Sequence, residues 1–86
     1  NIEGVIALGA AMDYIEKLGF ERIWNHEMQL LSYANEKLSS ISGLKIFGTS
    51  PSKAGVVSFV IDGLHSSDVG QILDQDAIAV RTGHHC

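Results

Sequence analysis

The spacing of apolar residues changes once along this chain, and that change constrains its fold more than any other feature. As far as Ile41, apolar side chains recur every three or four residues, which places them on one face of a helix. After Gly43 the apolar residues come in short runs rich in Val, Phe and Ile, which is typical of strands. The spacing therefore predicts an α+β fold.

The first half of the sequence predicts two helices, over residues 4–18 and 21–41. Gly19 follows the first apolar stripe and is well placed as a left-handed C-cap, and Gly43 is placed to end the second helix. The second helix is expected to be polar on its exposed face, and both helices are expected to pack with a small three-stranded sheet.

The second half predicts three short strands and one more helix. The strands are expected over residues 44–47, 55–61 and 77–81, and the helix over residues 67–75, capped by Ser66 or Ser67. His65, just before this helix, is interpreted as a solvated or capping side chain. Because the strand over 55–61 is apolar at most positions, it is expected to be covered on both faces. The predicted order is α-α-β-β-α-β, in one domain over residues 1–86.

Composition excludes several classes of partner. The chain has a net charge of −4 and no cluster of Lys or Arg, so a nucleic-acid surface is not expected. Its apolar runs are too short to span a membrane, and no basic segment of a signal peptide opens it. A single cysteine cannot form an intrachain disulfide, which favours a cytoplasmic location. Because the last predicted strand leads directly into the final residues, the chain is expected to be truncated.

The residues most suited to chemistry follow that last predicted strand and end at Cys86. They are Arg81, Thr82, Gly83, His84, His85 and Cys86. Gly83 allows the backbone to bend, and the neighbouring guanidinium and imidazoles favour the thiolate, the reactive form of a cysteine. A polar loop with an incidental cysteine fits the spacing equally well. Adjacent residues rarely direct their side chains to one ion, so no metal site is expected at this loop or at His65.

Residues 68–74, followed by residues 78–86 with the run Arg81–Cys86, resemble the C-terminal domain of the group II, or SUF-type, cysteine desulfurases. These are class V aminotransferases, fold-type I enzymes that use pyridoxal 5′-phosphate. The helix beginning near Ile2 also resembles the helix that enters the small domain of this family. The resemblance implies that the chain is a partial small domain of a larger, homodimeric enzyme whose large domain lies elsewhere.

The resemblance also implies a reaction. In this family L-cysteine is converted to L-alanine, and its sulfur passes to a protein cysteine as a persulfide, destined for an acceptor protein and iron–sulfur cluster assembly. Matched by motif, Cys86 is that nucleophile, and Arg81, Thr82, Gly83, His84 and His85 support its loop. Selenocysteine lyases and other class V relatives share the fold, so their activities remain alternatives.

One departure from the family pattern bears on activity. The His-Lys pair that carries the cofactor is absent, so no cofactor is expected on this piece, and the isolated chain is expected to be inactive. The non-enzymatic alternative is an interaction module with an incidental or redox-sensing Cys86. A module should fold with a satisfied surface, whereas a partial domain should expose an apolar patch of several hundred Å².

Overall fold

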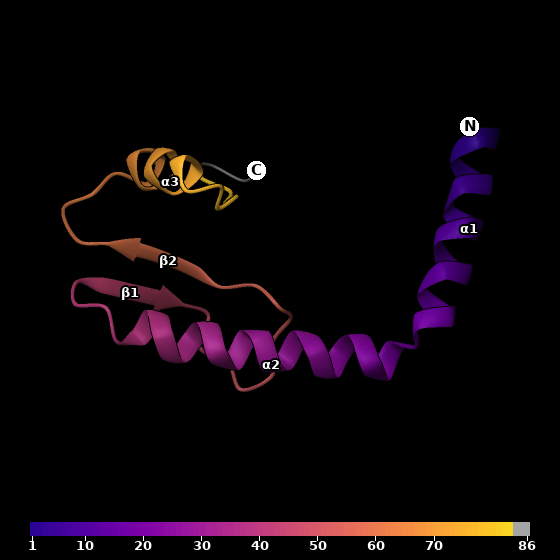
Figure 1. Ribbon diagram of the computed structural model, residues 1–86, viewed down its shortest axis with the longest axis horizontal. Helices are drawn as coiled ribbons and strands as arrows, with labels where there is room; N and C mark the ends of the chain where they lie inside the picture. Colours follow the sequence, from indigo (N-terminus) through magenta and orange to yellow (C-terminus); the bar gives the residue numbers. More distant parts are fainter. Residues whose placement is uncertain (84–86) are drawn as a thin grey trace.

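A computed structural model describes residues 1–83 and has an α+β architecture (Figure 1). Its elements are α1 (Ile2–Leu18), α2 (Phe20–Ser39), β1 (Leu44–Phe47), β2 (Ser58–Ile61) and α3 (Ser66–Gln75). The predicted fold class is confirmed, as are the two helices of the first half, whose ends differ from the predicted ones by at most two residues.

Helices α1 and α2 meet at Gly19 and diverge from there (Figure 1). The amide of Gly19 donates to the carbonyl oxygen of Ile15 at 2.9 Å, so Gly19 closes α1 as predicted. Its φ of 88° and ψ of 124° are not those of a left-handed helical cap, but the positive φ still favours glycine. Helix α1 therefore extends away from the sheet, whereas α2 runs beside β1. Of the two helices expected to pack with the sheet, only α2 does so within residues 1–83.

Strands β1 and β2 form an antiparallel pair in which Leu44 lies opposite Ile61 and Ile46 opposite Phe59. These four side chains are half-buried and share one face, since successive residues of a strand point to opposite faces. Val60, on the other face, is 44% exposed. The prediction that this strand is covered on both faces is thus wrong within the described chain, where only one face is partly covered.

Helix α3 begins at a histidine cap. Nδ1 of His65 accepts from the backbone amide of Ser67 at 3.3 Å and lies 2.5 Å from the hydroxyl of Ser67. The capping role open to His65 is confirmed, and the expectation that Ser66 or Ser67 caps the helix is wrong. Both serines lie in the first turn of the helix instead.

The predicted third strand does not form within residues 1–83, where the sheet has two strands. The physical reason lies at the end of α3. The amide of Ala77 donates to Asp74 and that of Ile78 donates to Leu73, with Ala77 at a φ of 59°. This pair of bonds is a Schellman motif, which reverses the chain at the end of a helix. Residues 78–83 consequently run back along α3 instead of pairing with β2.

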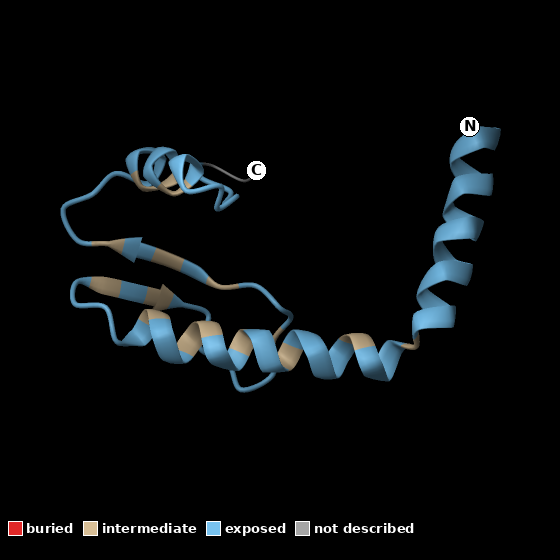
Figure 2. Ribbon diagram, viewed as in Figure 1, coloured by how far each residue is buried: buried red, intermediate tan, exposed pale blue. Residues whose placement is uncertain are grey.

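No residue of the described chain is fully buried (Figure 2). Its radius of gyration is 16.7 Å, whereas a compact domain of this length has about 12 Å. Its accessible surface is 7407 Å², about half as much again as the roughly 5,000 Å² of a compact monomer of this mass. Several apolar side chains of α1 are among the most exposed; Ile2 is 79% exposed and Val5 70%. Residues 1–83 do not by themselves enclose a hydrophobic core.

Within residues 1–83, none of the helices α1 to α3 has the length and hydrophobicity needed to cross a bilayer.

Candidate functional site

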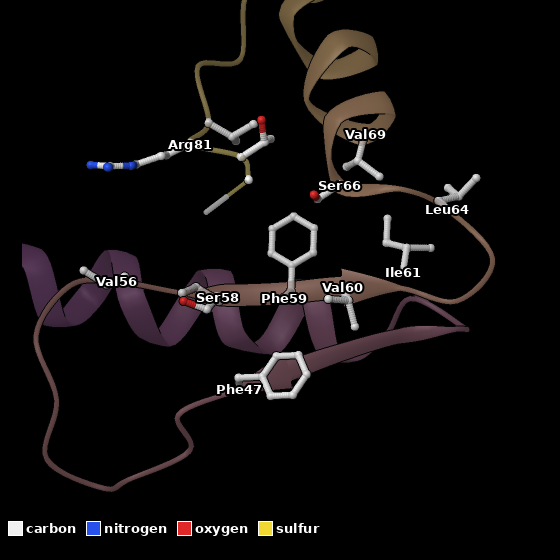
Figure 3. A pocket seen from close by; sticks show the side chains of 14 residues that line it. Phe47, Val56, Ser58, Phe59, Val60, Ile61, Leu64, Ser66, Val69 and Arg81 are labelled. Atoms are coloured by element: carbon white, nitrogen blue, oxygen red, sulfur yellow. The ribbon is translucent and has the colours of Figure 1, made fainter. Parts of the chain in front are cut away.

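Residues 80–83 face β2 across an open hollow of about 560 Å³ (Figure 3). The floor is β2, from which the ring of Phe59 points toward Ser66 at the start of α3. Val69 contributes an apolar wall from α3, and Arg81 belongs to the opposite rim. The hollow therefore lies between the sheet and the segment that leads into the Cys86 motif.

The structure places three of the six predicted site residues. Arg81, Thr82 and Gly83 all line the hollow and are exposed. The side chain of Arg81 extends away from the Phe59 ring (Figure 3). Gly83 has a φ of 88°, so the bend expected from a glycine at this position is confirmed. His84, His85 and Cys86 lie outside the described residues, and their predicted roles stay predictions.

Sequence reasoning missed two contributors to this region. The sequence pattern places Phe59 only in a strand, yet its ring forms part of the hollow. The pattern places Gly70 only in a helix, yet a Cβ built on it would lie 2.5 Å from Cγ2 of Thr82. A signal for Gly70 was present, because glycine inside a helix costs about 1 kcal/mol relative to alanine and so usually has a packing reason.

Among residues 1–83, no three His, Cys, Asp or Glu side chains gather as metal ligands would. His65 is engaged with Ser67 at the cap of α3. The described residues therefore do not form a metal-binding site.

The described residues do not fit pyridoxal phosphate, which needs a lysine to carry it. None of the four lysines lines the hollow. Nζ of Lys37 and of Lys45 lie 5.5 and 5.3 Å from aromatic ring centroids, and Lys53 donates to the carbonyl oxygen of Gly48 at 2.9 Å. Lys17 lies in the last turn of α1. A lysine that carries this cofactor would therefore have to come from outside the described residues.

The whole chain is similar in sequence to a known protein family and to several known proteins. The family model described as aminotransferase class-V covers residues 1–86. A probable cysteine desulfurase of Xylella fastidiosa is 46% identical over 86 residues, and a cysteine desulfurase of Serratia proteamaculans is 48% identical over 86. Each match includes 100% of this chain and 21% of the relative. A cysteine desulfurase of Synechococcus elongatus is 46% identical, with 14% of its length covered. The chain thus spans about a fifth or less of these relatives.

Proposed function

The chain belongs to the aminotransferase class-V family, and from that premise we propose that it is part of a cysteine desulfurase in which Cys86 accepts sulfur. The observation that carries the proposal is the run Arg81–Cys86 in a chain 46–48% identical over its whole length to proteins named cysteine desulfurase. The described start of that run lines an open hollow, as a group that must reach a substrate would require.

The proposed step is a transfer of one sulfur atom. The thiolate of Cys86 attacks the sulfur of L-cysteine and forms an S–S bond, while the C–S bond of the substrate breaks. The electron pair of that bond passes to the substrate carbon, which takes up a proton, so that L-alanine leaves and Cys86 carries the persulfide. Because none of the described residues offers a site for pyridoxal phosphate, the cofactor of the proposed enzyme is assigned to its remaining part.

The exposed apolar surface supports the larger enzyme over a self-contained interaction module. Helix α1 carries Ile2, Val5, Ile6 and Leu8, each more than 60% exposed. Leaving such side chains in water is unfavourable, because burying one stabilises a protein by about 1.5–3 kcal/mol. We propose that the remainder of the enzyme, including a large domain, covers α1. Homodimer formation, a cytoplasmic location and delivery of sulfur to an acceptor protein for iron–sulfur cluster assembly complete the proposal.

The full-length protein tests this function. It should show the absorbance of bound pyridoxal phosphate. Incubated with L-cysteine, it should release alanine, and the peptide that contains Cys86 should gain about 32 Da, the mass of one sulfur atom. Replacing the thiol by Cys86→Ala should leave the absorbance intact, remove the persulfide and sharply lower alanine release. A wild-type protein that neither binds the cofactor nor acquires the persulfide refutes the proposal. Faster release of selenium from selenocysteine than of sulfur from cysteine would identify a selenocysteine lyase instead.

A further inference from the structure

Helix α3 carries a glycine where the segment leading to Cys86 passes closest. A Cβ built on Gly70 would lie 2.5 Å from Cγ2 of Thr82, which is closer than real Cβ contacts come. Carbon atoms pack best at about 3.5–4.0 Å, so an alanine at this position cannot coexist with the present place of the Thr82 methyl group.

We propose that Gly70 is a positioning residue for the reactive cysteine: by lacking a side chain it lets Thr82 rest on α3 and so sets where the chain departs toward Cys86. This inference rests on the proposed function for its meaning in catalysis. Its physical basis is the contact itself, together with the turn at Ala77 that returns residues 78–83 along α3.

Other observations show why the contact matters for geometry. Thr82 and Gly83 precede Cys86 closely in the sequence, and Gly83 has a φ of 88°. Few fixed points precede them, since β2 faces this segment across a hollow and does not pair with it. A Cβ at Gly70 would either rotate the Thr82 side chain, whose χ1 is restricted by its β-branch, or push the backbone off the helix. A displacement of about 1 Å at a reacting group can slow catalysis by roughly 100-fold.

The distances at Thr82 also define a compensating change. The built Cβ of Gly70 lies 3.5 Å from Oγ1 and 3.6 Å from Cβ of Thr82, which are ordinary contacts. Only the methyl group is too close. Thr82→Ser removes that methyl and keeps the hydroxyl, so the double variant Gly70→Ala with Thr82→Ser should fit the native backbone.

The experiment uses the full-length protein with four variants: Gly70→Ala, Thr82→Ser, the double variant and Gln75→Ala. The last also introduces alanine into α3, at an exposed position away from Thr82. We expect Gly70→Ala to lower kcat for alanine formation about 10–100-fold with little change in KM, because it misplaces the nucleophile and leaves substrate binding intact. The double variant should return to the rate of Thr82→Ser alone, and Gln75→Ala should behave like wild type.

A second readout separates this inference from the proposed function. The rate at which iodoacetamide alkylates Cys86, followed by mass spectrometry of its peptide, needs no turnover. Gly70→Ala should change that rate and the double variant should restore it, even if the wild-type protein makes no persulfide. An unchanged alkylation rate in Gly70→Ala overturns the role of Gly70, as does a double variant that stays as impaired as Gly70→Ala.

Discussion

The backbone amide of Ile78 donates a hydrogen bond to the carbonyl oxygen of Leu73 at 2.9 Å, across the C-terminal end of α3. This bond, with the one from Ala77 to Asp74 at 3.0 Å, turns the chain back along the helix. The turn requires a positive φ at Ala77, which is the only non-glycine residue in the described chain to have one. The path toward Cys86 thus starts from a residue in a conformation that costs an alanine energy.

The turn at Ala77 predicts that Ala77→Gly stabilises the protein. A left-handed conformation costs a residue with a Cβ about 1–2 kcal/mol, and the greater freedom of glycine in the unfolded chain offsets roughly 0.5–1 kcal/mol of the gain. We therefore expect a net increase of about 0.5–1 kcal/mol in the free energy of unfolding, measured by urea denaturation of the full-length protein. Ala79→Gly is the matched control, because Ala79 has no positive φ and only the entropic cost remains. Equal effects of the two substitutions would contradict the role given to Ala77.

The cap of α3 predicts different effects on stability for two substitutions of His65. His65→Ala removes the acceptor of the Ser67 amide and should lower stability by about 1 kcal/mol, the usual cost of losing an N-cap. His65→Asp supplies a preferred capping carboxylate, which also interacts favourably with the positive end of the helix dipole, so it should equal or exceed the wild type. The midpoint of thermal unfolding of the full-length protein reports both changes. If His65→Ala and His65→Asp shift it alike, the imidazole does not cap α3.

The sequence predicts the helices better than the sheet, for a physical reason. The apolar stripes of residues 4–18 and 21–41 span several turns each, so their period is unambiguous and α1 and α2 form where expected. A short apolar run such as residues 77–81 carries no comparable signal. Its β-rich composition suggested a strand, but two hydrogen bonds at the end of α3 determine its path.

The sequence predicts only part of the candidate site, for a related reason. It shows which residues form the motif Arg81–Cys86, and Gly83 bends the chain as a glycine can. The contact of Gly70 with Thr82 joins residues twelve positions apart and depends on the turn at Ala77. The sequence does not predict that turn, because alanine rarely adopts a positive φ. The hollow in front of Phe59 likewise depends on where the turn places residues 80–83, which line it without joining the sheet.

The separation of α1 from the sheet predicts a difference in hydrogen exchange between the isolated 86-residue chain and the full-length protein. Helix α1 makes little contact with the rest of the chain beyond its junction with α2, so its amides should exchange fastest in the isolated chain (Figure 1). Amides of β1, β2 and the part of α2 beside them should exchange more slowly. In the full-length protein α1 should become strongly protected, because we propose that the remainder covers it. Equal exchange of α1 in both forms would count against that cover.

The lining of the hollow predicts that the isolated 86-residue chain has no desulfurase activity. The isolated chain, given pyridoxal phosphate and L-cysteine, should release no alanine above the level of free cofactor, since no lysine lines the hollow beside residues 80–83. The comparison is the full-length protein at equal molarity, with alanine measured by chromatography. The isolated chain still contains the thiol, so it should accept sulfur from an added persulfide donor by thiol exchange, and Cys86→Ala should not. Alanine formed by the isolated chain would show that the described residues do suffice for the cofactor, and the assignment of catalysis to a larger enzyme would then fail.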